Sequence, residues 1–97
     1  MKGRHMRGQV SFVFCDNALG VIRVAAKRRL EEKGNGGFVS IHEALGVITE
    51  EYHELVRAVE SDDRKAIHGE LVDVVVACVF ALASDHAGTM EWWRSGE

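Results

Sequence analysis

The sequence contains no proline, only two cysteines and few aromatic residues. Because proline breaks the interior of a helix, its absence leaves long stretches free to form helices. Cys15 and Cys78 are too few for a disulfide framework, so we expect a reducing, cytoplasmic location. The longest apolar run, residues 71–83, includes Asp73 and is shorter than the roughly 20 residues that span a bilayer. It predicts a core helix and no membrane segment.

The chain has 97 residues, of which 46% are hydrophobic, and these values predict one small folded domain. We assign residues 1–8 to a tag remnant or a disordered N-terminus, and residues 9–97 to a single helical domain. The basic start of the chain does not resemble a secretion signal. Because so short a chain buries a limited core, we expect it to associate with copies of itself.

Hydrophobic spacing predicts an all-α fold with three main helices, at about residues 16–33, 40–60 and 63–84. A short C-terminal helix is expected at about residues 89–94. Residues 9–14 are apolar but too few to show a period, and we interpret them as an extended arm. The apolar third helix should complete a four-helix-type bundle by homodimerisation.

Capping residues place the starts of two of these helices. Ser40 and Glu43 form a capping box for the second helix, and Asp63 can cap the third. In the first helix, Leu19, Ile22, Ala26 and Leu30 share one side. The apolar positions of the second helix repeat at alternating spacings of four and three, which predicts a core seam. That seam consists of Ile41, Leu45, Ile48, Tyr52, Leu55 and Val59.

Two acidic pairs stand out against this apolar background. Glu51 and Glu54 in the second helix, like Glu70 and Asp73 in the third, have the i,i+3 spacing that places both carboxylates on one helix face. On a helical wheel, small residues surround both pairs, which leaves room beside the acids. Between Lys65 and Arg94 the chain has no lysine or arginine to neutralise Asp73.

Carboxylates in such apolar surroundings must pair, become protonated or bind a cation. With oxygen ligands alone, a hard divalent cation is favoured, and Mg²⁺ in particular combines a few carboxylates with the phosphates of a substrate. Residues 1–42 hold eight lysines and arginines against three acids, whereas residues 43–73 hold nine acids against three bases. This asymmetry is typical of a site where carboxylates hold a metal and nearby cations meet phosphate.

The motif Glu50-Glu51-x-x-Glu54, followed by Glu70-x-x-Asp73, resembles the EExxE and ExxD signature of the MazG-like nucleoside triphosphate pyrophosphohydrolases. These are members of the all-α NTP pyrophosphatase superfamily, and the resemblance covers residues 40–84. It implies Mg²⁺-dependent hydrolysis of the α–β phosphoanhydride of a nucleoside triphosphate, giving a nucleoside monophosphate and pyrophosphate. Mn²⁺ is a substitute metal, and the assembly implied is a homodimer or a dimer of dimers.

The resemblance also implies roles for the acids. Glu51, Glu54, Glu70 and Asp73 would be metal ligands, and Glu50 an outer carboxylate or base; all five count as catalytic. Two related enzymes remain as alternatives, phosphoribosyl-ATP pyrophosphatase and a dUTP/dCTP-type hydrolase. A further alternative is a non-catalytic helical module that binds nucleotides or a partner.

Cations for the phosphates are harder to assign from the sequence. Longer members of the family carry a basic segment after the third helix, where this chain has only Arg94. The substitutes are Arg23 and Lys27 of the first helix, or Arg64 and Lys65 from a neighbouring subunit. Trp92 could stack on a base, although a terminal aromatic pair more often packs against the bundle. The net charge of −3 and the lack of interleaved aromatic residues disfavour nucleic acid as a partner.

Overall fold

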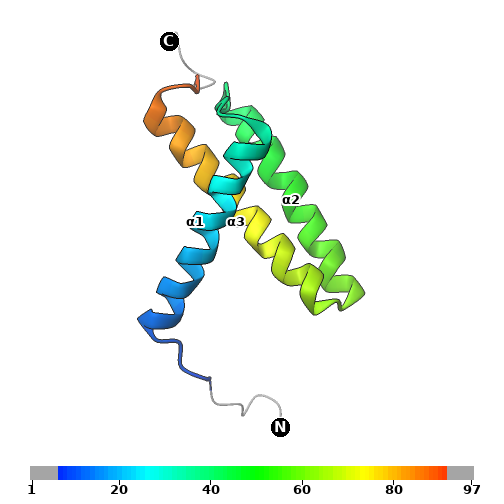
Figure 1. Cartoon of the computed structure of the whole chain (residues 1–97). Coiled ribbons are helices and arrows are strands. Elements are labelled where there is room, and N and C mark those ends of the chain that lie inside the picture. The colour runs from blue at the N-terminus through cyan, green and yellow to red at the C-terminus, as the bar shows by residue number, and fades with distance from the viewer. Residues whose placement is uncertain (1–6, 92–97) are drawn as a thin grey trace.

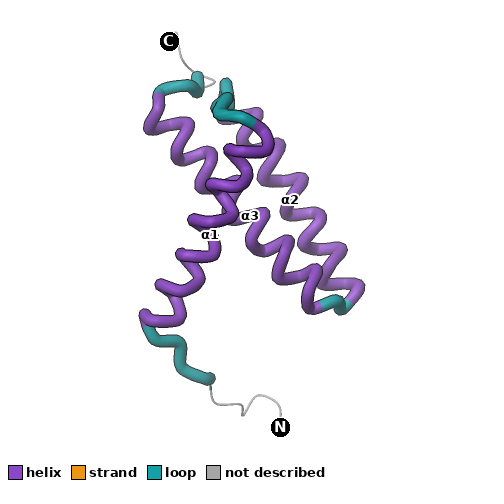
Figure 2. Tube along the Cα trace, viewed as in Figure 1, coloured by secondary structure: helices purple, strands orange, loops and turns teal. Residues whose placement is uncertain are grey.

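The structure is a computed structural model that describes residues 7–91, and this part of the chain folds into three helices without a strand. They are α1 (Phe12–Lys33), α2 (Ile41–Ser61) and α3 (Arg64–Ala87). Helices α2 and α3 form an antiparallel hairpin, and α1 crosses α3 (Figures 1 and 2). The predicted all-α class is therefore confirmed.

The caps predicted for α2 and α3 are present. The Ser40 side chain accepts a hydrogen bond from the amide of Glu43 at 3.1 Å, and Glu43 Oε1 accepts one from the amide of Val39 at 2.8 Å. The Asp63 carboxylate accepts the amides of Lys65 and Ala66. These bonds satisfy amides that a helix start otherwise leaves without partners. Both helices therefore begin within a residue of the predicted position.

Helix α1 is longer at its start than the sequence indicated. It begins at Phe12, so the extended arm predicted for residues 9–14 is wrong for residues 12–14. The residue before it, Ser11, makes no side-chain capping bond. This start therefore lacks the local signal that marks the other two helices. The first part of α1 projects away from the hairpin (Figure 1). Its apolar side chains there are exposed.

The segment after α3 is extended in its described part. Helix α3 ends at Ala87 and is capped by Gly88, which has a φ of 74°. Glu91 then forms an isolated parallel bridge with Ser40. The short helix predicted from residue 89 is therefore wrong for residues 89–91. Trp92, Trp93 and Arg94 lie outside the described residues, as does most of the 1–8 segment that we assigned to a tag or a disordered N-terminus.

A polar clasp fastens the loop between α1 and α2 to the end of α3. The amide of Phe38 donates to Ser84 Oγ at 3.0 Å, and the hydroxyl of Thr89 donates to the carbonyl of Phe38 at 2.7 Å. The Phe38 ring packs edge-on against Phe80, with ring centroids 5.4 Å apart. At Gly37 an added Cβ would lie only 2.6 Å from Thr89 Oγ1, so this close approach requires glycine.

Small residues form the contact between α2 and α3. Ala44, Ala58 and Ala77 are buried there and allow the two backbones to approach closely. The larger residues of the predicted α2 seam are consequently only partly covered, and Leu45, Tyr52 and Val59 are each more than half exposed. The sequence identified an apolar seam, but within one chain this seam is covered only in part, with Ile41, Ile48 and Leu55 half-buried.

Helix α3 also leaves apolar surface uncovered, with Leu71, Val75 and Leu82 exposed. By length and composition alone, the whole helix could cross a membrane, which the count of residues 71–83 had not indicated. A core helix of a soluble assembly has the same composition, and α3 packs against both other helices. Homodimerisation that would cover these surfaces is a proposal, to which we return below.

Candidate metal and nucleotide site

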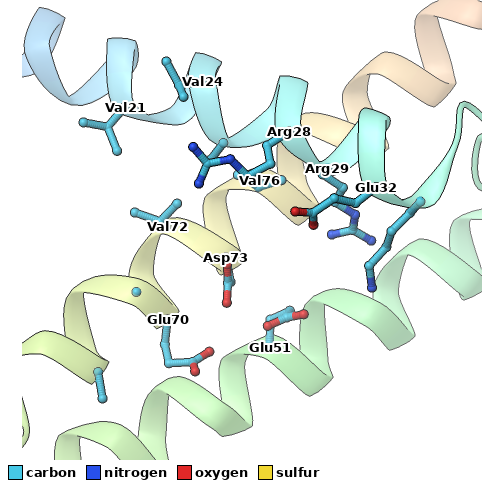
Figure 3. A pocket seen from close by; sticks show the side chains of 14 residues that line it. Val21, Val24, Arg28, Arg29, Glu32, Glu51, Glu70, Val72, Asp73 and Val76 are labelled. Carbon is cyan, nitrogen blue, oxygen red and sulfur yellow. The ribbon is translucent and has the colours of Figure 1, made fainter.

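Three carboxylates converge where α2 faces α3. Glu51 extends from α2, and Glu70 and Asp73 extend from successive turns of α3 (Figure 3). One oxygen from each lies within 4.8 Å of the others. The i,i+3 spacing places Glu70 and Asp73 on the same face of α3, and the close alanine contacts bring Glu51 opposite them. We call these three residues the carboxylate triad.

Two oxygens of the triad lack partners. The Oε1 atoms of Glu51 and Glu70 are buried, and neither has a hydrogen-bond partner. Both side chains are half-buried, whereas Asp73 is exposed at the open edge. A buried carboxylate oxygen without a partner costs free energy that a bound cation would recover. The triad is therefore open to solvent at Asp73, and on its buried side it has two carboxylate oxygens without hydrogen-bond partners.

Charge repulsion acts on the same groups. Burial raises the pKa of Glu51, and the nearby Glu54, Asp73 and Glu70 raise it further. Burial also raises the pKa of Glu70, together with Asp73 and with Glu54, to which a protonated Glu70 can donate a hydrogen bond. Both shifts mean that the metal-free site holds protons more tightly than free glutamate does.

A divalent cation fits the triad. Mg²⁺ binds oxygen at about 2.1 Å, so two oxygens on opposite sides of the ion are about 4.2 Å apart. The three carboxylate oxygens lie within 4.8 Å of one another, a limit slightly longer than this oxygen–oxygen distance. Small side-chain rotations can remove the difference. Glu51, Glu70 and Asp73 would then hold the ion, which leaves coordination positions for water and for phosphate oxygens.

The remaining predicted residues have different positions. Glu54 is half-buried beside Glu70, outside the triad, and Glu50 is exposed on α2. Arg23 and Lys27 are exposed on α1 and do not line the cleft beside the acids, and Lys65 is exposed in the first turn of α3. The roles of Glu54 as a metal ligand and of Glu50 as an outer carboxylate stay predictions. The roles of the three cations as substrate ligands also stay predictions, as does that of Trp92, which lies outside the described residues.

A cleft of about 790 Å³ lies between α1 and the triad. Its α1 wall carries three cations, Arg28, Arg29 and Lys33, which sequence reasoning missed. The apolar spacing had placed Leu19, Ile22, Ala26 and Leu30 on one side of α1. Of these, Leu19 and Leu30 are exposed, whereas Ile22 and Ala26 are half-buried. A signal was present, because Val21, Ala25, Arg28 and Glu32 also recur at helical spacing and form the wall that faces the acids.

The cleft has the size of a small-molecule site and combines cations with a carboxylate triad. Fold and site together define an all-α protein with a candidate divalent-cation site that faces a wall carrying three cations. A family model for the MazG nucleotide pyrophosphohydrolase domain matches residues 40–91. The chain therefore belongs to the MazG family, as the acidic motifs predicted, and this membership implies a pyrophosphohydrolase that acts on a nucleotide substrate. Comparisons with curated proteins and with solved structures found no match.

The matched segment corresponds to a structural unit. It begins at Ser40 and ends at Glu91, the two residues of the isolated bridge that closes the α2–α3 hairpin. The whole triad lies inside this unit. Helix α1, with the three cations that line the cleft, lies outside it. Family membership thus covers the acids of the site but leaves the opposite wall to be explained from this chain alone.

Proposed function

We propose that this chain is a Mg²⁺-dependent nucleoside triphosphate pyrophosphohydrolase that cleaves the α–β phosphoanhydride to give a nucleoside monophosphate and pyrophosphate. The observation that carries the proposal is the convergence of Glu51, Glu70 and Asp73 with two buried, unpartnered oxygens. A structural ion pair would satisfy those oxygens with a lysine or arginine. A site prepared for a metal and its phosphate ligands leaves them open.

Each acid has a role in this proposal. Glu51, Glu70 and Asp73 would hold the ion, and Glu54, also predicted to bind it, would restrain Glu70 from the neighbouring turn of α2. Mg²⁺ held there would neutralise phosphate charge and would lower the pKa of a coordinated water, so that this water could act as a nucleophile at neutral pH. Glu50 remains the candidate outer carboxylate that accepts the proton of the water, since it directly precedes Glu51.

We further propose that the active form is a homodimer or a dimer of dimers. Leu45, Tyr52 and Val59 on α2 are exposed, as are Leu71 and Leu82 on α3. Such large apolar side chains on a small domain are typical of surfaces that pack against another protein. A second copy would complete the four-helix-type bundle by covering these surfaces.

A substrate panel tests the reaction. The protein is incubated with Mg²⁺ and, separately, with each canonical NTP, dUTP, dCTP and phosphoribosyl-ATP, and pyrophosphate is measured. We expect pyrophosphate with the matching monophosphate from at least one substrate, and none from Asp73→Asn. Orthophosphate as the only product would contradict cleavage between the α and β phosphates. No release from any substrate, with metal shown to be bound, would support a non-catalytic nucleotide-binding module instead.

A further inference from the structure

The wall opposite the carboxylate triad comes from a helix that the family match does not include. Arg28, Arg29 and Lys33 of α1 line the cleft across from the acids of α2 and α3. Figure 3 shows Arg28 and Arg29 on α1 and the triad on the facing helices. A cation-lined wall that faces a metal-binding wall across one cleft fits a ligand that carries several negative charges along its length. A polyphosphate chain has this chemistry.

Of the three cations, Arg29 is the one whose side chain is held in a fixed position beside the cleft. It is half-buried, and its guanidinium carbon lies 5.4 Å from the centre of the Phe80 ring. A guanidinium over an aromatic face is held in orientation without losing its hydrogen-bond donors. Phe80 is itself held by the Phe38 ring of the loop clasp, so the support of Arg29 is part of the folded core.

Arg29 acts on the triad electrostatically without closing it. Its charge lowers the pKa of Glu51, against the larger effect of burial. The buried Oε1 of Glu51 nevertheless has no hydrogen-bond partner, so the Arg29 guanidinium does not bond to that oxygen. Arg29 therefore lies close to the acids with donors that can serve a ligand bound between the two walls.

We propose that Arg29 is a substrate-binding residue of this site, and that it binds the phosphate oxygens of a polyphosphate chain held against the triad. The role deepens the proposed hydrolysis and rests on it, but it comes from α1, which lies outside residues 40–91. A guanidinium can donate two parallel hydrogen bonds to one phosphate, which fixes both position and orientation. Arg28 and Lys33 add positive charge along the same wall.

Glu32 provides an independent check on this role. It lies one turn after Arg29 on α1 and lines the same cleft, so its charge opposes a polyphosphate that Arg29 attracts. Glu32→Gln should therefore bind polyphosphate several-fold more tightly. A purely structural Arg29 and Glu32 would not give opposite effects on anion binding.

The test is calorimetric binding of inorganic tripolyphosphate in the presence of Mg²⁺, which measures the polyphosphate contact without a base or a reaction. Arg29→Met keeps an unbranched stem over Phe80 and removes the charge. We expect it to weaken tripolyphosphate binding roughly 10- to 100-fold, as for the loss of a charge-assisted hydrogen bond. Arg29→Lys should fall between Met and wild type. Binding of Mn²⁺ alone should be unchanged or tighter, because a nearby positive charge has been removed.

Arg57→Met is the matched control. Arg57 is exposed on α2 and lowers the pKa of Glu70, yet it does not line the cleft, so its loss should change tripolyphosphate binding by less than about threefold. The role of Arg29 is refuted if Arg29→Met binds like wild type, if Arg57→Met loses as much, or if wild type does not bind tripolyphosphate. Arg29-dependent binding without pyrophosphate release from any NTP would refute only the proposed hydrolysis. Hydrolysis by Arg29→Met with the wild-type KM would refute only the role of Arg29.

Discussion

Replacing Glu70 with glutamine should stabilise the metal-free protein, because the triad is a cluster of like charges. Glu70 lies within 4.8 Å of two other carboxylates, and two unit charges at about 4 Å repel by about 1 kcal/mol in water and about 4 kcal/mol at an effective dielectric constant of 20. Asp73 is exposed and Glu70 half-buried, so the lower part of this range applies, about 1–2 kcal/mol. The glutamine amide can also donate a hydrogen bond to Glu54 or Glu51.

Thermal unfolding with and without metal measures this effect. For a domain of this size, 1 kcal/mol corresponds to about 4–8 °C in Tm. In EDTA, Glu70→Gln should melt several degrees above wild type. In saturating Mg²⁺ the order should reverse, because a metal present at 100 times its Kd stabilises wild type by about 2.7 kcal/mol. Glu31→Gln, an exposed acid of α1 outside the cleft, should stay within about 0.5 kcal/mol. A Glu70→Gln variant that is less stable than wild type in EDTA would refute the repulsion.

Three further predictions concern pH, the loop clasp and the oligomer. The raised pKa values of Glu51 and Glu70 mean that the folded metal-free protein binds more protons than the unfolded chain. The two ionised carboxylates therefore destabilise the fold fully above their raised pKa values. This destabilisation fades as the pH falls towards the ordinary pKa of glutamate. The stability gap between Glu70→Gln and wild type should therefore narrow from pH 7 to about pH 4.5 in chemical unfolding, and a constant gap would contradict the shifts. Gly37→Ala should lose about 1–3 kcal/mol in urea unfolding, because its Cβ would meet the hydroxyl of Thr89, whereas Gly36→Ala, with open space around it, should be neutral. Leu45→Glu should shift light scattering towards the monomer, and a monomeric wild type would contradict the proposed assembly.

The sequence was sufficient for the features that depend on local signals. Ser40 and Asp63 cap the helices they were predicted to cap. The Ser40 hydroxyl and the Asp63 carboxylate each accept hydrogen bonds from amides in the first turn of their helix. The i,i+3 pairs predicted that each helix presents two acids on one face, and Glu51, Glu70 and Asp73 do converge. Capping and helical periodicity act within a few residues, which is why a single sequence can show them.

The sequence was insufficient where contacts between distant parts of the chain determine which side of a helix is buried. Helix α1 has apolar residues on more than one side, and its rotation depends on contact with α3, so Arg29 could not be distinguished from Lys27 as the residue facing the acids. Likewise, the wide seam of Leu45, Tyr52 and Val59 was predicted as the core of one chain. The alanines of α2 and α3 allow a closer contact on another face, and these three residues of the seam stay exposed.

The central claim is that carboxylates of α2 and α3 together hold a divalent cation, and a Mn²⁺ titration followed by electron paramagnetic resonance tests it most directly. Wild type should bind Mn²⁺ saturably and release it to excess Mg²⁺. Asp73→Asn and Glu51→Gln should each weaken binding by at least about tenfold, while Asp85→Asn, an exposed acid of α3 outside the triad, should bind as wild type does. Equal Mn²⁺ affinity in Asp73→Asn and wild type would contradict the account.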